Sequence, residues 1–308
     1  MTIESLESLL ELENKEVMKL AVVACEDEEV LEAVVESSKR GISEPILIGD
    51  IEKTKAIAKE KGLDISSYKV IDEKDLGLAS EIGVKMVSNG EANFIMKGLV
   101  DTATLLKAVL NKEWGLRTDS LLSHVMVYQI PSYSKLIYLT DGGMNLEPNV
   151  DNKVKIIENA SIVAKSLGKE EVKVACLAAK EKVDPKMIAT VDANDLKSMY
   201  EKGSFSKGII VDGPMALDLA VSSSSAEIKG YKSDVAGDAD VLLVPNIEMG
   251  NGIGKSITYF AKGKSAGIVM GAKSPIVLVS RADDHETKLY SIALGSAIAS
   301  YLQGIRKD

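Results

Sequence analysis

The sequence predicts an α/β fold built on a mainly parallel sheet, and two observations support this class. Short apolar runs that suit buried strands alternate with stretches of helical periodicity along almost the whole chain of 308 residues. Hydrophobic residues make up 45% of the chain but aromatic residues only 4%, so the core must be mainly aliphatic. Strands of a parallel sheet are buried on both faces and are rich in such side chains.

The order of the elements follows from this alternation. Leucines at helical spacing predict a first helix over residues 6–12. Apolar runs predict strands over residues 19–25, 45–48, 69–71, 94–96, 123–129, 135–139, 172–178, 208–211, 241–244, 268–270 and 275–279. Amphipathic stretches predict helices over residues 28–38, 54–61, 79–88, 102–110, 154–167, 185–202, 254–262 and 286–302, with another beginning at residue 215. Two consecutive strands, at 123–129 and 135–139, suggest a hairpin that marks the passage into a second domain.

Composition argues against several function classes. The net charge is −9 and no run of Lys and Arg is present, which argues against nucleic-acid binding. No apolar run approaches the roughly 18 residues of a membrane span, and residues 1–20 lack the apolar core of a signal peptide. Cys25 and Cys176 make neither a disulfide framework nor a metal cluster, so we expect a reduced, cytoplasmic location. His124 and His285 are too few and too dispersed for a metal site, and we expect no metal.

The sharpest local feature is the pair Ser280-Arg281, which follows a predicted strand and precedes the last helix. Ligands of parallel sheets bind beyond the carboxyl ends of strands, and a helix N-terminus favours anions. Arg281 is therefore suited to hold a phosphate through two hydrogen bonds. A structural interpretation has equal weight: Arg281 pairs with a carboxylate, while Asp283 and Glu286 have the spacing of a capping box.

A second candidate is the segment GNGIGKS at residues 250–256. It is similar to a phosphate-binding loop but misses the pattern G-x-x-x-x-G-K-[ST] by one residue, so nucleotide hydrolysis is not favoured. Backbone N–H groups of such a turn, at Gly250 and Asn251, can still bind a phosphate. The alternative, that the glycines only provide turn conformations, is supported at least as well by the local sequence.

The segment from Lys97 to Thr102 is a third strand end that leads into a helix. Thr102, or the aspartate before it, can cap the helix. Lys97 lies where a cation meets an anionic ligand, and Gly98 follows it. Lys107 sits one to two turns into the helix, so its side chain either reaches back toward this end or is simply solvated.

Two other polar positions have mainly structural interpretations. Asp141 lies in the turn TDGGMN at residues 140–145, where a tight turn is the default interpretation and a role in ligand binding the alternative. Cys25 ends the first strand and precedes four acidic residues, which would raise the pKa of its thiol. We therefore do not expect Cys25 to act as a nucleophile.

Taken together, these segments resemble the phosphate acetyltransferase and phosphate butyryltransferase family, over most of the chain and closer to the butyryltransferase branch. The resemblance rests on residues 96–110, 140–145, 212–214, 236–240, 246–256 and 271–281. Each is weakly specific alone, but their order and joint presence are highly specific. The resemblance implies a two-domain, three-layer α/β/α fold similar to isocitrate and isopropylmalate dehydrogenases, with the active site in the interdomain cleft. It also implies a first domain of residues 1–122 and 281–308, and a second, of residues 123–280, that mediates a homodimer.

The resemblance further implies roles for single residues. The family's catalytic serine and arginine fall on Ser280 and Arg281. The acid that the acetyltransferases carry falls on Thr287 here, so Glu286, a capping aspartate or no strong base takes its role. Their phosphate-binding arginine falls on Lys107, a point charge and not a bidentate fork. The residues assigned to catalysis are Ser280, Arg281 and Glu286, and those assigned to substrate binding are Lys97, Gly98, Thr102, Lys107, Asp141, Gly250 and Asn251.

The implied reaction moves a short-chain acyl group between coenzyme A and inorganic phosphate. Coenzyme A is then a substrate, no cofactor is covalently bound, and an acyl-phosphate kinase is a functional partner. Thr287 supports an alternative, a catalytically impaired coenzyme A-binding or regulatory protein on the same fold. A dehydrogenase would need a metal-binding aspartate cluster and a nicotinamide site, and neither pattern is present. The acyl length is open, because each methylene is worth only about 1–3 kcal/mol in a pocket.

Overall fold

The computed structural model describes residues 2–12, 16–280 and 283–306. By its contacts the chain divides into two compact units. The N-terminal unit comprises residues 6–120 and 265–308, and the central unit comprises residues 1–5 and 121–264. No helix among the described residues has the length and apolar character that crossing a membrane requires.

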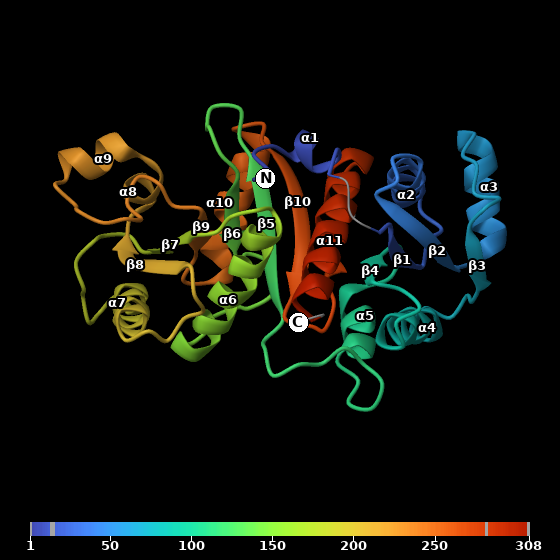
Figure 1. The fold of residues 1–308 in the computed structure, drawn as a ribbon, viewed down its shortest axis with the longest axis horizontal. Coiled ribbons are helices and arrows are strands. Elements are labelled where there is room, and N and C mark those ends of the chain that lie inside the picture. The colour runs from blue at the N-terminus through green and yellow to red at the C-terminus, as the bar shows by residue number, and fades with distance from the viewer. Residues whose placement is uncertain (1, 13–15, 281–282, 307–308) are drawn as a thin grey trace. The chain divides into compact units, whose positions relative to one another are not determined.

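Strands and helices alternate through most of the N-terminal unit (Figure 1). Its elements are α1 (Leu6–Leu9), β1 (Met18–Val23), α2 (Glu28–Lys39), β2 (Ser43–Gly49), α3 (Ile51–Lys61), β3 (Lys69–Asp72), α4 (Leu76–Ser88), β4 (Phe94–Lys97), α5 (Thr102–Val109), β10 (Lys264–Met270), β11 (Ile276–Val277) and α11 (His285–Arg306). Their strands lie in the order β3-β2-β1-β4-β11-β10. Pairing is parallel from β3 to β11, and β10 runs antiparallel to β11.

Two glycines show that helices cover both faces of this sheet. A Cβ atom on Gly83 of α4 would lie 3.3 Å from a side-chain carbon of Ile95, and one on Gly295 of α11 would lie 2.9 Å from the ring of Phe94. Phe94 and Ile95 are neighbours in β4, and successive side chains of a strand point to opposite faces. The two helices therefore pack on opposite faces of β4, and both positions need glycine for the close approach.

The central unit also has a mixed sheet. Its elements are β5 (Ser123–Gln129), β6 (Ile137–Thr140), α6 (Val150–Ser166), β7 (Val172–Leu177), α7 (Ile188–Glu201), β8 (Ile209–Met215), α8 (Leu217–Val221), α9 (Ser223–Ile228), β9 (Val241–Leu243) and α10 (Ile247–Tyr259). Strand order is β5-β6-β9-β7-β8, parallel from β6 to β8. The antiparallel pairing of β5 with β6 confirms the predicted hairpin. Aliphatic side chains of its strands and helices form the core.

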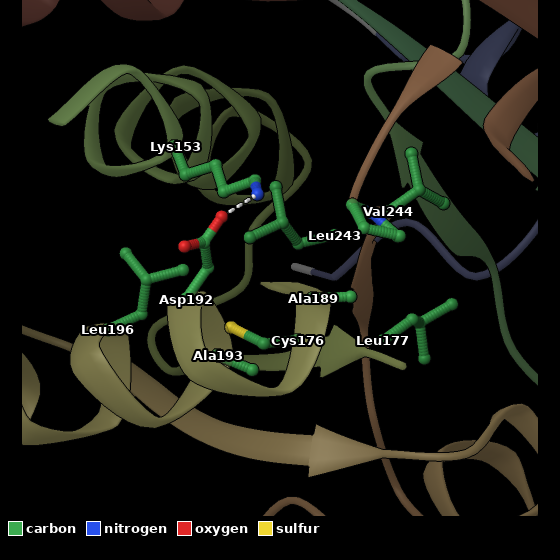
Figure 2. A pocket seen from close by; sticks show the side chains of 10 residues that line it. Lys153, Cys176, Leu177, Ala189, Asp192, Ala193, Leu196, Leu243 and Val244 are labelled. Atoms are coloured by element: carbon green, nitrogen blue, oxygen red, sulfur yellow. Dashed lines mark hydrogen bonds and ion pairs between the residues drawn. The ribbon is translucent and has the colours of Figure 1, made fainter. Parts of the chain in front are cut away.

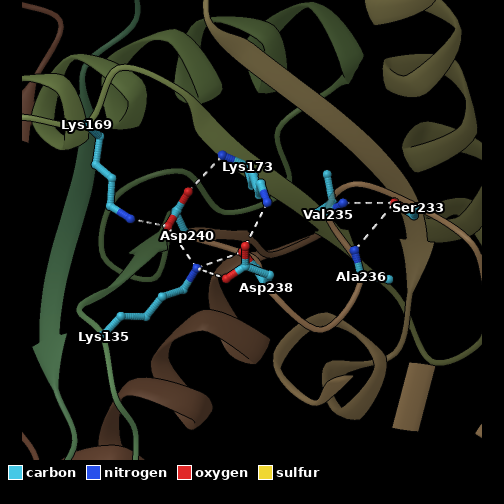
Figure 3. A network of polar contacts seen from close by, with 8 residues as sticks. All are labelled: Lys135, Lys169, Lys173, Ser233, Val235, Ala236, Asp238 and Asp240. Carbon is cyan, nitrogen blue, oxygen red and sulfur yellow. Dashed lines mark hydrogen bonds and ion pairs between the residues drawn. The ribbon is translucent and has the colours of Figure 1, made fainter. Parts of the chain in front are cut away.

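A network of lysines and aspartates closes the amino-terminal ends of strands in the central unit (Figure 3). The Asp240 carboxylate, only 3% exposed, accepts hydrogen bonds from Lys135 and Lys169, at 2.9 and 2.8 Å. Asp238 accepts from Lys135 and Lys173, both at 2.7 Å. These residues precede or begin β6, β7 and β9. Residues 236–240, part of the family resemblance, thus hold opposite charges together at the end of the sheet where ligands of such folds do not bind.

The structure confirms the predicted fold class and corrects two local expectations. Residues 250–256 form the middle of α10 and not a glycine-rich turn, because Asn246 caps the helix by accepting the Met249 N–H at 3.0 Å. The helix expected from residue 215 is split into α8 and α9, with Ser222 capping the second. The division of contacts puts residues 265–280 in the N-terminal unit, since β11 pairs with β4 and β10 pairs with β11.

We expect Gly295→Ala to lower the free energy of unfolding by about 1–3 kcal/mol, the usual effect of overfilling a packed site. The matched control is Gly304→Ala in the same helix, where an added Cβ would contact nothing within 4 Å. The control should leave stability equal or slightly higher, because alanine favours helix. Urea unfolding midpoints measure both effects, and equal midpoints would contradict the close packing of α11 on β4.

We expect Asp240→Asn to destabilise the protein because it leaves Lys135 and Lys169 without their shared carboxylate. Breaking a buried ion pair costs about 3–5 kcal/mol, and we expect less here because both lysines retain some contact with water. Asp234→Asn, at an exposed position, is the control and should change stability by less than about 0.5 kcal/mol. Thermal unfolding of the two variants tests the expectation, which fails if their transitions coincide.

Candidate functional site

Two of the sequence-predicted segments leave the sheet of the N-terminal unit side by side. β4 pairs with both β1 and β11, with Lys97 opposite Val23 and Met96 opposite Val277. β4 ends at Lys97, and Ser280 follows three residues after Val277. The carboxyl ends of neighbouring parallel strands lie at one edge, where ligands of α/β sheets bind. The structure therefore brings the Lys97 and Ser280 segments to the same edge.

The turn after β4 lies directly against the end of β1. The Gly98 N–H donates to the Val23 oxygen at 2.8 Å, and the Leu99 N–H donates to the Ala24 oxygen at 2.7 Å. A Cβ atom on Gly98 would lie 2.1 Å from the same Ala24 oxygen, so only glycine fits. Lys97 is 7% exposed, and its ammonium donates to the main-chain oxygens of Gly98 and Val100 at 3.2 and 3.1 Å. Its charge is thus held inside this turn.

Helix α5 begins at this turn and is capped by Asp101. The Asp101 carboxylate accepts the Thr104 N–H at 2.9 Å and the Thr104 hydroxyl at 2.6 Å. These hydrogen bonds, the hydroxyl first, lower the pKa of Asp101. Thr102 is the exposed first residue of the helix and not its cap. Lys107 lies in the last turn and is exposed.

Two hydrogen bonds join Ser280 to Asp283 between β11 and α11, and we call this joined pair the Ser280 turn. The Ser280 N–H donates to the Asp283 carboxylate at 2.8 Å, and the Asp283 N–H donates to the Ser280 oxygen at 3.2 Å. Asp284 caps the helix by accepting the Thr287 N–H at 2.9 Å. The capping box predicted for Asp283 and Glu286 is therefore wrong by one residue: Asp284 is the cap and Thr287 lies three residues after it, while the Asp283 carboxylate accepts the Ser280 N–H.

Glu286 lies in the first turn of α11, and its carboxylate accepts the Tyr290 hydroxyl at 3.1 Å. Arg281, assigned to catalysis with Ser280 and Glu286, lies outside the described residues. Burial alone would raise the pKa of the Asp284 carboxyl group. Hydrogen bonds from Thr287 and the charges of His285 and Lys288 nevertheless hold that pKa below its usual value.

In the central unit, Asp141 organises the turn that follows β6. The side chain is 2% exposed, and its oxygens accept the N–H groups of Gly143 and Met144, both at 2.9 Å. They also accept the His124 N–H at 3.1 Å and the Asn145 side-chain amide at 2.6 Å. Donors of the protein itself thus occupy the Asp141 carboxylate, which agrees with the interpretation of residues 140–145 as a structural turn.

Gly250 and Asn251 lie in α10 beside this turn. Because the Gly250 N–H donates to the Asn246 oxygen within the helix at 3.3 Å, it is not presented in a phosphate-binding loop. A Cβ atom on Gly250 would lie 2.5 Å from Cα of Gly142, so the glycine serves close packing of helix and turn. Asn251 is exposed.

A pocket that the sequence does not predict lies at the carboxyl ends of β7 and β9 (Figure 2). Lys153 of α6 is 4% exposed, and its ammonium lies 2.5 Å from the Asp192 carboxylate of α7. Cys176, Leu243 and Pro245 also line the pocket. The two charged residues are 39 positions apart, so no local pattern could pair them. Each neutralises the other, and we assign this pocket no substrate.

The environment of both cysteines disfavours the thiolate form at neutral pH. Burial raises the pKa of Cys25 to about 11, with the negative charge of Glu26 adding to the shift and a hydrogen bond with Thr54 opposing it. Burial raises the pKa of Cys176 to about 12. The prediction for Cys25 agrees with this environment, although burial contributes more than the acidic residues on which the prediction relied.

One group of side chains among the described residues has metal-ligand spacing. His285 Nδ1 lies 3.7 Å from a Glu29 oxygen and 3.8 Å from a Glu32 oxygen. The His285 side chain is 55% exposed, and Lys61 already contacts Glu32 at 3.6 Å. These contacts fit a surface ion-pair cluster, and we assign it no metal.

Comparisons with known proteins agree on one family. The chain matches the model described as phosphate acetyl/butaryl transferase over residues 4–80 and 73–296. It is 44% identical to the phosphate butyryltransferase of Clostridium acetobutylicum, over 95% of this chain and 97% of that protein. It is 41% identical to the phosphate acetyltransferase of Thermotoga maritima, over 96% of this chain and 99% of that protein.

Solved structures agree with these relatives. The crystal structure of a branched-chain phosphotransacylase from Enterococcus faecalis matches with a TM-score of 0.81 at 31% identity, covering 92% of this chain and 99% of that one. A 4-hydroxythreonine-4-phosphate dehydrogenase from Klebsiella pneumoniae has a similar fold, with a TM-score of 0.56 at 12% identity, over 92% of this chain and all of that one. The similarity in sequence extends along nearly the whole length, and the chain belongs to the phosphate acetyl/butaryl transferase family.

Proposed function

We propose that this enzyme transfers a short acyl group between coenzyme A and inorganic phosphate, with butyryl and branched acyl groups as the first substrates to test. The observation that carries the proposal is the Ser280 turn beside the Lys97 turn, in a chain that belongs to this family. In the forward direction, a phosphate oxygen attacks the thioester carbon, the carbon–sulfur bond breaks, and the products are acyl phosphate and coenzyme A. No step in this reaction needs a metal or another cofactor.

The proposed roles follow the chemistry of the two substrates. Arg281 binds phosphate, with Lys107 as a second cation. Ser280 donates a hydrogen bond to the sulfur. Charged and polar side chains that the protein fixes in place stabilise the charge that develops in the transition state. Lys97 and Gly98 shape the turn beside Ser280, and Thr102 lies at the exposed start of α5.

We propose Glu286 as the group that takes the thiol proton in the reverse direction. A free thiol has a pKa near 8.5, so only about a few per cent is thiolate at pH 7, and a nearby base is useful. The carboxylates of Asp283 and Asp284 accept backbone N–H groups that close the turn and cap the helix. Glu286 instead accepts a tyrosine hydroxyl, a contact compatible with proton transfer.

The remaining assignments concern the central unit and the assembly. Because the Asp141 carboxylate is filled by protein donors and Gly250 packs against Gly142, we propose that both act by shaping the local backbone. Asn251 is exposed and keeps its proposed role in binding. A cytoplasmic homodimer that works with an acyl-phosphate kinase is proposed on the family resemblance alone.

The purified protein is expected to release free coenzyme A from acyl-CoA only when phosphate is present. A thiol-reactive dye measures this release with acetyl, propionyl, butyryl and isobutyryl thioesters. Arg281→Ala should lower kcat by about 10²–10³, the usual effect of losing one transition-state donor. Arg40→Ala, which removes an exposed arginine paired with Glu36, is the matched control and should leave kcat unchanged.

Two outcomes of this assay would contradict the proposal. Normal turnover by Arg281→Ala would show that the assignment of Arg281 to the active site is wrong. Tight binding of coenzyme A without phosphate-dependent release, over all acyl lengths, would favour the catalytically impaired coenzyme A-binding protein. Thr287, at the position where the acetyltransferases carry an acid, is the residue that motivates this second candidate.

Glu286→Gln is expected to lower kcat by about 10²–10⁴ if this carboxylate takes the proton. The pH dependence of the residual rate should lose the limb that reports the base. Asp284→Asn is the control: asparagine caps a helix about as well as aspartate, so this variant should leave the kcat of the folded enzyme unchanged. If Glu286→Gln keeps full activity while Asp283→Asn loses it, the base is Asp283.

A further inference from the structure

Lys288 is a buried lysine next to the Ser280 turn, and no role follows for it from the reaction described so far. The residue is 4% exposed, although lysines are almost never fully buried without a partner. It lies in the second turn of α11, two residues after Glu286. The hydrogen bond that the structure gives its ammonium runs to the main-chain oxygen of Asp283. A buried charge of this kind is costly to keep, so its contact with the turn needs an explanation.

The helix that carries Lys288 is firmly fixed to the sheet. Leu289, Tyr290 and Ile292 are all buried, and α11 packs against α2 as well as against β4 and β11. One turn further on, the Ser291 hydroxyl accepts the Gly267 N–H of β10 at 2.9 Å. The stem of Lys288 therefore starts from a part of the core that does not shift easily.

From this fixed point, the contacts lead to Ser280 in two steps. Lys288 holds the carbonyl of Asp283. Asp283 in turn is joined to Ser280 twice, through its carboxylate at 2.8 Å and through its N–H at 3.2 Å. Fixing the Asp283 peptide therefore limits where the Ser280 backbone can lie. Small displacements of a reacting group are costly in catalysis, and about 1 Å can cost about 100-fold in rate.

We propose that Lys288 is a positioning residue that holds the Ser280 turn in its active geometry through the main chain of Asp283. The inference rests on the proposed function, because it gives the turn a catalytic purpose. Direct contact with substrate does not fit Lys288, since its side chain is buried. The Lys288 ammonium, carried by a helix fixed in the core, donates a hydrogen bond to the main-chain oxygen of Asp283.

Lys288→Met tests the proposal, because methionine keeps the aliphatic stem and removes the donor. We expect kcat to fall about 10- to 100-fold, while KM for phosphate and for acyl-CoA changes less than about threefold. Lys288→Arg restores a donor and should recover most of the rate. Lys135→Met, which removes a lysine from the Lys–Asp network of the central unit, should reduce stability and leave kcat unchanged.

Amide hydrogen exchange supplies a readout that does not depend on activity. The Ser280 and Asp283 N–H groups both close the turn, so in Lys288→Met they should exchange roughly three- to tenfold faster, the effect of losing one hydrogen bond. Amides in the middle of α11 should exchange as in the wild type. Lys288→Arg should return both turn amides to the wild-type rate.

The two proposals fail in different ways. If the wild-type protein shows no phosphate-dependent transfer, the proposed function fails, and exchange at Ser280 and Asp283 alone decides the role of Lys288. With an active wild type, a Lys288→Met variant that keeps full kcat overturns the positioning role. A rise in KM for phosphate at unchanged kcat also overturns it, because that result would mean direct binding. Unchanged exchange at both amides overturns it in either case.

Discussion

The candidate site depends on the distance between two backbones at the end of β1. Gly98 brings the turn after β4 so close that a single methyl group would collide with the Ala24 oxygen. Two N–H groups of the turn donate to β1, and Lys97 folds its ammonium back onto the same turn. The direction in which α5 leaves the sheet follows from this contact. β4 pairs with β1 along one edge and with β11 along the other. The Ser280 turn, which follows β11, therefore leaves the sheet next to the turn that follows β4.

Much of this arrangement could be predicted from the sequence, because burial repeats with a regular period. Strands such as β5 (Ser123–Gln129) and helices such as α2 (Glu28–Lys39) were expected within one residue of their bounds. Their signals are local: apolar runs for buried strands, and spacing for helices. The order of strands and helices then indicated the parallel pairing that brings Lys97 and Ser280 to one edge.

The wrong predictions concern residues whose role is decided by contacts that a local sequence pattern does not specify. Glycines in GNGIGKS indicated a loop, yet the Asn246 cap and packing against Gly142 keep that segment helical. Asp283 has the spacing of a cap, but the Ser280 N–H competes for its carboxylate. No pattern in the sequence singled out Lys153, because its partner Asp192 lies 39 positions further along the chain. Local propensity does not contain such tertiary contacts.

The burial of both cysteines has a chemical consequence for a protein that handles thioesters. A thiol attacks a thioester as its thiolate. With the pKa of Cys25 near 11 and that of Cys176 near 12, only about one thiol in ten thousand or fewer is ionised at pH 7. Both side chains are also shielded from solvent. Neither cysteine is therefore suited to capture an activated acyl group, and acylation of a protein thiol does not compete with transfer to phosphate.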